Sequence, residues 1–354
     1  MSKIKEKMTK SRLNLRNMVK IGVAYLAVCM MFIACDKDNG NGNNDDPGGN
    51  GNENNNKWIQ KANYPAAAVA NAVAFSINGK IYVGMGSNAT GDKNDLWEYD
   101  PATNKWTEKK DFPGQTNTAY FVVNDKAYVL YLNQMWEYSP TNDSWIQKAD
   151  CPTHPTFGVC INNKGYVGIL NSYSNSQSFY EYSPETDTWK QCADFVGLNR
   201  RAITAVSTGQ NAYIIGGNGP VCAGYESKLR SDNFWTYSPI NDKWTQKADF
   251  PSGIGLVYGL SFCREGVIYA GLGIESRQGS SSASSADRYT YIDEIYKYDA
   301  NNNSWNSFGK PPISQRCLAI SVVCNGKLYI GLGVYRHPFY GAGPYHLDFW
   351  EYSF

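Results

Sequence analysis

Aromatic and polar residues alternate along most of the chain from residue 57 onward, in short runs that return about every 50 residues. In the run Leu96–Asp100 the aromatic side chains lie two positions apart, which predicts a β-strand. Pro101 and the polar residues behind it predict a tight turn, and Trp106 opens the next strand. This strand–turn–Trp pattern occurs five times, with the second tryptophan at Trp106, Trp145, Trp189, Trp244 and Trp305.

A second hairpin precedes each of these units. Residues 72–77 and 80–83 are apolar runs around Asn78-Gly79, a pair typical of a two-residue hairpin turn. The equivalent turn pairs are Asn124-Asp125, Asn162-Asn163, Gly209-Gln210, Glu265-Gly266 and Asn325-Gly326. Four strands per unit predict an all-β fold made of repeated four-stranded sheets.

The two ends of this region complete each other. Trp350–Phe354 matches the third strand of a unit with no strand after it, and Trp58–Ala62 matches a fourth strand with none before it. We expect these segments to pair in one sheet, which closes a ring and leaves no open edge. The count is then six blades over residues 57–354.

This pattern resembles the kelch β-propellers, which are built of four-stranded blades with an aromatic third strand and a turn to tryptophan. The chain departs from the family at the glycine pair, because only Gly216-Gly217 is a true double glycine. The resemblance implies a six-bladed kelch-type β-propeller closed by its N- and C-terminal strands. Such folds carry enzymes, binding proteins and structural subunits, so the fold does not choose among them.

The N-terminus predicts export and lipidation. Residues 1–20 are basic, and Ile21–Ala34 is an apolar stretch shorter than the roughly 20 residues of a membrane-spanning helix, as in a signal peptide. Ala34 before Cys35 resembles the lipobox of a bacterial lipoprotein, which implies that Cys35 is acylated and that residues 1–34 are removed. Phe32 departs from the aliphatic residue usual in that motif. A transmembrane anchor and an ordinary secretory signal are the alternatives.

Residues 35–56 are almost wholly Asn, Gly, Asp and Glu, which predicts a disordered tether because they can bury little apolar area. The acidic cluster behind Cys35 resembles the surface-export signal of Bacteroidetes lipoproteins. We therefore expect an outer-membrane lipoprotein, attached only through its lipid, with its domain at the cell surface. The periplasmic face stays open as the second placement.

Charge excludes one class of partner. Without residues 1–34 the chain keeps 26 basic and 31 acidic side chains, which argues against nucleic-acid binding. The three histidines form no His-x-x-His pair, and no phosphate-binding loop or Gly-x-Ser-x-Gly motif occurs, so we expect neither a metal nor a cofactor. The cysteines after Cys35 are odd in number and predict no disulfide framework, although Cys151 with Cys192 is a candidate pair.

Loop length points to one face of the ring. The loops from second to third strand and the connections from fourth to first strand leave on the same side, called the long-loop face below. The second-to-third loops are short in the first three blades, at 87–94, 132–134 and 171–177, and long in the last three, at 218–233, 274–291 and 334–347. We expect binding there by basic, aromatic and imidazole side chains, namely Arg201, Lys228, Arg230, Arg277, Arg288, Arg316, Arg336, His337, Tyr345 and His346.

One long loop carries a second resemblance. The segment from Glu226 to Asp232 is similar to a Glu…Lys-Pro-Gly-Leu-Arg-Thr-Asp segment of bacterial N-acetylneuraminate epimerases, with the Pro-Gly missing. Those enzymes are six-bladed kelch propellers that interconvert sialic acid anomers. The resemblance implies Glu226 as the proton-moving carboxylate and Arg230 as the group that binds the substrate carboxylate.

The sequence thus favours a non-catalytic binder of an extracellular glycan or protein on the long-loop face. The alternatives are a sialic acid mutarotase and a structural subunit of a surface complex. Polar and aromatic residues converging on a pocket would favour a sugar, whereas a flat face would favour a protein. The sequence does not define the oligomeric state.

Overall fold

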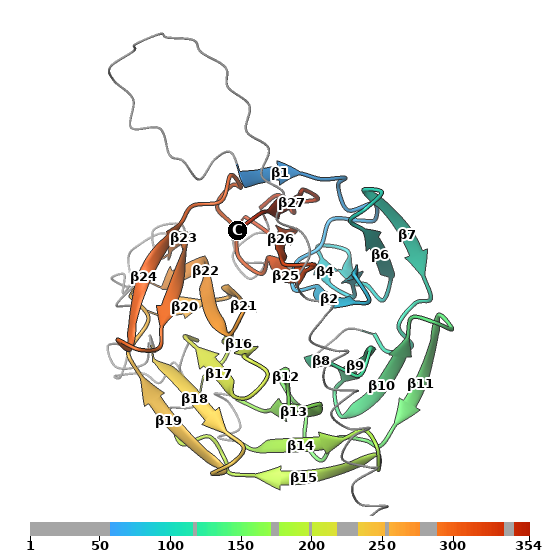
Figure 1. The fold of residues 1–354 in the computed structure, drawn as a ribbon. Helices are drawn as coiled ribbons and strands as arrows, with labels where there is room; N and C mark the ends of the chain where they lie inside the picture. The colour runs from blue at the N-terminus through green and yellow to red at the C-terminus, as the bar shows by residue number, and fades with distance from the viewer. Residues whose placement is uncertain are drawn as a thin grey trace, which may run out of the picture. The chain divides into compact units, whose positions relative to one another are not determined.

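The computed structural model describes residues 57–115, 119–170, 177–197, 200–217, 233–251, 255–276, 289–335 and 343–354. Its strands form six antiparallel sheets around a ring, each with its first strand at the centre and its last at the rim (Figure 1). The described residues contain no helix, and hence none that could span a membrane. The predicted all-β, six-bladed propeller is confirmed. The signal peptide and tether predicted for residues 1–34 and 35–56 lie outside the described residues.

The blades follow one another along the chain. Blade 1 comprises β2 (Val73–Ile77), β3 (Lys80–Gly84), β6 (Leu96–Asp100) and β7 (Lys105–Lys109), with a small hairpin of β4 (Ser87–Asn88) and β5 (Gly91–Asp92). Blade 2 comprises β8 (Ala119–Val123), β9 (Lys126–Tyr131), β10 (Gln134–Ser139) and β11 (Ser144–Lys148). Blade 3 comprises β12 (Phe157–Ile161), β13 (Lys164–Gly168), β14 (Phe179–Ser183) and β15 (Thr188–Cys192).

The second half of the ring follows the same plan. Blade 4 comprises β16 (Thr204–Ser207), β17 (Ala212–Ile215), β18 (Phe234–Ser238) and β19 (Lys243–Lys247). Blade 5 comprises β20 (Leu256–Val257), β21 (Leu260–Arg264), β22 (Val267–Ser276), β23 (Tyr289–Asp299) and β24 (Ser304–Gly309). Blade 6 comprises β25 (Ile320–Cys324), β26 (Lys327–Gly331), β27 (Phe349–Tyr352) and, from the other end of the chain, β1 (Trp58–Gln60).

The two ends of the propeller close the ring as predicted. β1 pairs with β27 in antiparallel register, with Trp58 opposite Tyr352 and their rings 4.8 Å apart. Lys61 N donates to Phe349 O at 2.8 Å, which continues the pairing beyond β1. Blade 6 therefore combines β1 from the N-terminal end of the propeller with β25, β26 and β27 from its C-terminal end. This pairing closes the ring.

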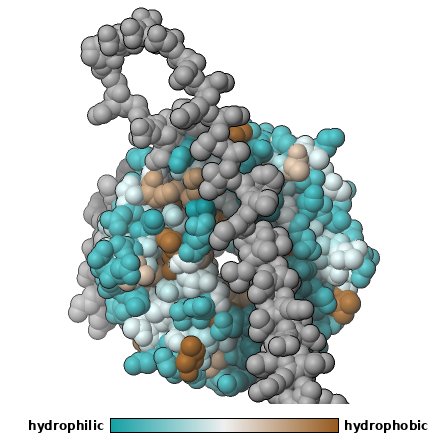
Figure 2. Space-filling view, in the orientation of Figure 1, coloured by the Kyte–Doolittle hydropathy of each residue, from teal (hydrophilic) through white to brown (hydrophobic). Residues whose placement is uncertain are grey.

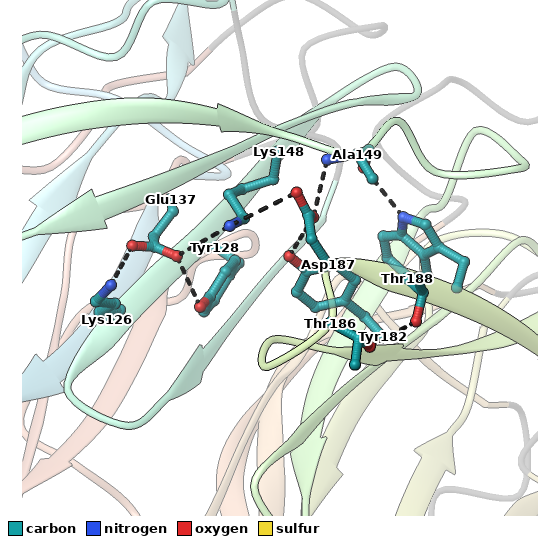
Figure 3. Close-up of polar contacts among 10 residues, drawn as sticks. Lys126, Tyr128, Glu137, Lys148, Ala149, Tyr182, Thr186, Asp187 and Thr188 are labelled. Atoms are coloured by element: carbon teal, nitrogen blue, oxygen red, sulfur yellow. Dashed lines mark hydrogen bonds and ion pairs between the residues drawn. The ribbon is translucent and has the colours of Figure 1, made fainter.

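Each pair of neighbouring blades shares one hydrophobic cluster, and a polar clasp joins each of blades 1 to 5 to the blade before it. Between blades 2 and 3, Tyr182 donates its hydroxyl to Asp187 at 2.6 Å, and the same carboxylate accepts Ala149 N of blade 2 at 3.0 Å (Figure 3). Trp189 Nε1 then donates to Ala149 O at 3.0 Å. Asp187 has a positive φ of 53°, which Asn and Asp tolerate best among non-glycine residues. This explains the Asn or Asp two positions before each second tryptophan.

A buried carboxylate lies beside the clasp. Glu137 on β10 is 6% exposed and accepts the hydroxyl of Tyr128 at 2.9 Å, with Lys126 and Lys148 paired to it (Figure 3). Lys148 also reaches Asp187, at 3.6 Å, and so joins the two carboxylates. Buried charges persist when they are paired and hydrogen-bonded, as here.

The hairpin turns agree with prediction, and one loop boundary does not. Positive φ occurs at both residues of Asn78-Gly79, as a type I′ turn requires. The sequence predicted a loop over the whole of 274–291. In the structure β22 continues to Ser276, and β23 already begins at Tyr289. Tyr289, Thr290 and Tyr291 are residues that favour strands, so the ladder extends beyond the disk. The viewed face of the blades is mostly hydrophilic, with separate hydrophobic spots (Figure 2).

Candidate functional site

A cavity of about 630 Å³ lies where the inner strands of all six blades begin. Its walls are the starts of these strands and the connections that lead into them, such as Asn71-Ala72 before β2 and His154–Thr156 before β12. The cavity therefore lies on the side of the fourth-to-first connections, which is the long-loop face. Its volume falls within the roughly 300–1,000 Å³ of small-molecule sites.

Four hydroxyl groups in the cavity wall, of Tyr120, Thr204, Ser261 and Ser321, are called the hydroxyl belt below. Three of them are on the second residue of an inner strand. Tyr120 in blade 2 donates to Ala74 O of blade 1 at 3.1 Å. Ser261 in blade 5 donates to Ala205 O of blade 4 at 3.3 Å, and Ser321 in blade 6 donates to Ser261 O at 3.0 Å. In all three bonds the acceptor is the carbonyl of the second residue of the preceding blade's inner strand, which faces the next blade.

Two further hydroxyls belong to the cavity wall. Thr204 Oγ1 lies 2.7 Å from Ser261 Oγ. Either hydroxyl of this pair can donate; with the hydrogen of Ser261 on Ala205 O, Thr204 is the donor. Thr156 accepts Leu170 N at 3.2 Å. Burial raises the pKa of Tyr120, so this phenol stays neutral near pH 7.

The mouth of the cavity is held by a chain of backbone hydrogen bonds. Tyr258 N donates to Ala202 O at 3.1 Å, Leu318 N to Tyr258 O at 3.0 Å, and Asn71 N to Leu318 O at 3.1 Å. These four residues occupy equivalent positions in blades 4, 5, 6 and 1, and all have φ of 55–56°. Strained backbone of this kind clusters at functional sites and persists only where its surroundings hold it.

Further backbone pairs join the loops to the same connections. In blades 1, 5 and 6 the connection pairs with the start of the second-to-third loop, through Ala70↔Ser87, Val257↔Ile274 and Cys317↔Val334, respectively. A seventh hydrophobic cluster, made of residues from these blades, fills the layer between them. The bases of the long loops are thus rigid where they meet the cavity.

Aromatic residues stand at these loop bases. Tyr291 on β23 stacks on Tyr335 of blade 6 with ring centres 5.2 Å apart and an interplanar angle of 10°. Tyr345 and Tyr258 pack against the seventh cluster, and burial raises the pKa of Tyr345. Tyr345, predicted from the sequence as a binding residue, is therefore half-buried beside the mouth rather than fully exposed.

The basic residues of this face that the structure describes are buried or half-buried and bond to the protein itself. Arg316 is 2% exposed and holds Asp348 with both guanidinium arms, at 2.5 and 3.0 Å, while Nη1 also donates to Leu332 O at 3.1 Å. Arg200 is fully buried in the equivalent place of blade 4 and donates to Gly216 O at 3.0 Å. Arg201 lies half-buried next to it. We expected an accessible Arg316, but its charge is committed to Asp348.

His346 lies beside this pair. Its backbone N donates to Gly333 O at 3.0 Å, and its side chain is half-buried. Burial lowers the pKa of His346, and the charge of Arg316 lowers it further. The imidazole is therefore neutral near pH 7. For Asp348, burial raises the pKa, but Arg316 more than offsets this and holds it below its usual range.

The other predicted binding residues, Lys228, Arg230, Arg277, Arg288, Arg336 and His337, lie outside the described residues, as do Glu226 and Cys35. Conversely, the sequence did not single out the hydroxyl belt. Part of its signal was present, because Tyr120, Ser261 and Ser321 are the second residues of their inner strands, where the other blades have Ala74, Gly158 and Ala205. Alternation alone does not reveal which face of that strand lines the channel.

The candidate disulfide is wrong. Cys151 and Cys192 are free thiols, because Cys151 packs between blades 2 and 3 whereas Cys192 packs between blades 3 and 4. Burial raises the pKa of Cys151 to about 11, which leaves it an unreactive core residue. In the described part of the chain no cluster of His, Cys, Asp and Glu is arranged to hold a metal ion.

Comparisons with known proteins agree with the architecture. Residues 68–113, which include all four strands of blade 1, match the family model of the kelch motif. The protein is thus a six-bladed β-propeller that carries a kelch motif.

Among solved structures, the chain is similar to the one titled "Structure of YjhT", with a TM-score of 0.64 and 16% sequence identity over 81% of this chain and 96% of that chain. At this identity the likeness concerns the fold. No curated protein sequence matches the chain.

Proposed function

We propose that the protein is an exported, lipid-anchored β-propeller that binds an extracellular glycan in the cavity of its long-loop face. The observation that carries the proposal is the convergence of all six blades on one cavity with hydroxyl, amide and imidazole groups in its wall and tyrosines beside its mouth. A pocket of this kind suits a small polar ligand such as a sugar unit better than a protein surface. Long loops around a rigid ring are also where binding residues concentrate.

The full-length protein, purified in mild detergent, tests this on a glycan array followed by calorimetric titration of the strongest ligands. We expect saturable binding that is lost when the cavity is narrowed. Binding of a protein partner with no response to any glycan would contradict the proposal and favour a surface-complex subunit.

The anchor is the second part of the proposal, and it rests on Ala34-Cys35 after the apolar stretch. Because the thiol would be the attachment point of the lipid, Cys35→Ala should move the protein from the detergent-rich to the aqueous phase, or leave the uncleaved precursor. Cys29→Ala, in the apolar stretch itself, is the matched control and should change neither. Unchanged detergent partitioning of a Cys35→Ala protein that is still cleaved to the mature length would contradict the lipoprotein assignment. Protease treatment of intact cells then separates the cell-surface from the periplasmic placement.

The sialic acid mutarotase remains the enzymatic alternative. It needs a carboxylate to move a proton between the anomeric hydroxyl and the ring oxygen, and Glu226 and Arg230 are its only named candidates. In the described part of the cavity wall there is neither a carboxylate nor a guanidinium. One-dimensional NMR of sialic acid anomers decides: we expect the spontaneous rate with this protein, and an accelerated rate lost in Glu226→Gln would establish the enzyme.

A further inference from the structure

The belt hydroxyls of the cavity wall already donate their hydrogens to other groups of the protein. Each hydroxyl carries one hydrogen to donate and two lone pairs to accept. Tyr120 donates to Ala74 O, Ser261 to Ala205 O, and Ser321 to Ser261 O. Thr204 donates to Ser261 Oγ, as the last step of the same belt. What these four groups can still offer a ligand is their lone pairs.

This commitment follows from the fold rather than from the choice of rotamer. Three of the four bonds run from the second residue of an inner strand to a backbone carbonyl of the preceding blade, so the acceptor is fixed by the main chain. If one of these hydroxyls turned its hydrogen to a ligand, that carbonyl would lose its partner. These bonds are partly buried, and losing one costs free energy, so the belt resists the change.

The rest of the described wall has no Asp, Glu, Lys or Arg. Its other side chains are apolar, as in Ile203 and Leu260, or carry the hydroxyl of Thr156, the amide of Asn71 or the imidazole of His154. On the connections of this face, the guanidinium groups of Arg200 and Arg316 are buried and donate to backbone carbonyls and Asp348, and Arg201 is half-buried beside Arg200. The belt hydroxyls offer a ligand only acceptors, and the described wall holds no Lys or Arg. A carboxylate, which can only accept, therefore finds no side-chain donors there other than the amide of Asn71 and the imidazole of His154.

We propose that the cavity receives a neutral, uncharged saccharide unit, whose hydroxyls donate to Tyr120, Thr204, Ser261 and Ser321, and that it discriminates against uronic and sialic acids. This rests on the proposed glycan-binding function and adds the chemical class of the ligand. An alkylammonium ligand would also donate, but the described wall supplies no carboxylate to balance its charge. Sugar hydroxyls donate without a net charge and leave their ring carbons to pack on the apolar residues.

Paired ligands test the proposal with the full-length protein in detergent. The glycan array contains neutral oligosaccharides beside their acidic counterparts, such as lactose with 3′-sialyllactose and galactan fragments with oligogalacturonates. We expect calorimetric Kd values at least tenfold weaker for the acidic member of each bound pair. Equal or stronger binding of the acidic members would overturn the inference while leaving glycan binding intact. Absence of binding to every neutral and acidic member would overturn both.

Variants link the selectivity to the belt. Thr204→Val, Ser321→Ala and Tyr120→Phe each remove one acceptor while nearly keeping the shape, and we expect each to weaken the neutral ligand by about two- to tenfold. Ser76→Ala on β2, an inner-strand serine outside the cavity wall, is the control and should leave Kd unchanged. Because a structural role alone would not change selectivity, the ratio of the neutral Kd to the acidic Kd must also rise toward one in the belt variants. A constant ratio would contradict the belt as its origin, and thermal unfolding identifies any variant that is merely misfolded.

Discussion

Blades 1, 4, 5 and 6 meet the long-loop face differently from blades 2 and 3. In the first group the connection into the inner strand adopts positive φ at Asn71, Ala202, Tyr258 and Leu318, and backbone hydrogen bonds run from one blade to the next. In blade 3 the equivalent residue is Pro155, whose ring fixes φ near −65° and removes the N–H donor. Blade 3 instead contributes the exposed His154 to the cavity wall.

The second-to-third junction shows the same division. Met85, Gly216 and Leu332 directly follow the second strands of blades 1, 4 and 6, and Leu272 holds the equivalent position inside β22 of blade 5, where the register shifts. All four have positive φ. Blade 2 instead turns from β9 to β10 through only Leu132 and Asn133. The clasps at the rim repeat in blades 1 to 5, whereas the mouth of the cavity does not repeat in all six. The difference teaches that repetition builds the ring and departures from it build the site.

The largest effect expected is from removing the strand that closes the ring. Deleting Trp350–Phe354 removes all of β27 except Phe349, together with the rings of Tyr352 and Phe354, which pack on Phe308. Each buried aromatic lost costs about 3–5 kcal/mol, against a total stability of about 5–15 kcal/mol. We expect no folded protein by circular dichroism and calorimetry, whereas deleting residues 36–55 should leave the melting temperature unchanged. A truncated protein that melts at the parent temperature would show that the ring closes elsewhere.

The second largest effect compares the buried ion pair of Arg316 in blade 6 with the longer ion pairs of Lys148 in blades 2 and 3. Arg316→Met leaves Asp348 charged and without its bidentate partner, which should cost about 3–5 kcal/mol of unfolding free energy. Lys148→Met removes ion pairs of 3.6 and 3.9 Å to Asp187 and Glu137, and should cost under about 1 kcal/mol. Urea unfolding measures both. Equal costs would mean that the Arg316 pair is no more buried in solution than the Lys148 pairs.

Proline substitution tests the backbone chain at the mouth. Ala202→Pro forbids the positive φ of that residue and should cost about 3 kcal/mol or more, with loss of ligand binding. Pro155→Ala, at the same position of blade 3, meets no such constraint and should change stability by less than about 1 kcal/mol. If Ala202→Pro unfolds like the parent and still binds, the chain of backbone bonds does not hold the mouth.

The smallest effect expected is the acid dependence of blade 6. Burial raises the pKa of Glu351, but its bonds with Lys327, Tyr329 and Lys61 more than offset this, so its pKa and that of Asp348 lie below their ordinary values. Because the folded pKa is lowered, the stabilisation is present above about pH 4–5 and is lost as pH falls through the folded values. Urea unfolding from pH 7 to 3 should show this decline, with a shallower slope in Glu351→Gln. An identical slope in that variant would contradict a role for Glu351.

Much of the ring was predictable, and most of the site was not. The half-units at Trp58 and Trp350 predicted both the blade count and the closure, because each repeat reports its strands through local alternation. The burial of Arg316 depends on Asp348, 32 residues away, and no local pattern marks that pair. Likewise, Ala, Tyr and Leu rarely adopt positive φ, so the conformation of Ala202, Tyr258 and Leu318 comes from contacts between blades rather than from their own preferences.

The central claim is that the cavity on the long-loop face is the ligand site, and filling it is the most direct test. Ala205→Trp places an indole in the cavity wall. Ile240→Trp adds the same group at a turn residue that is 90% exposed and does not line the cavity. The measurement is calorimetric titration of both full-length variants with the neutral oligosaccharide that binds best on the array. The account predicts unchanged melting temperatures, parent-like affinity for Ile240→Trp and at least a hundredfold weaker binding for Ala205→Trp. Parent-like affinity in both variants would contradict it, because the ligand would then lie outside the cavity.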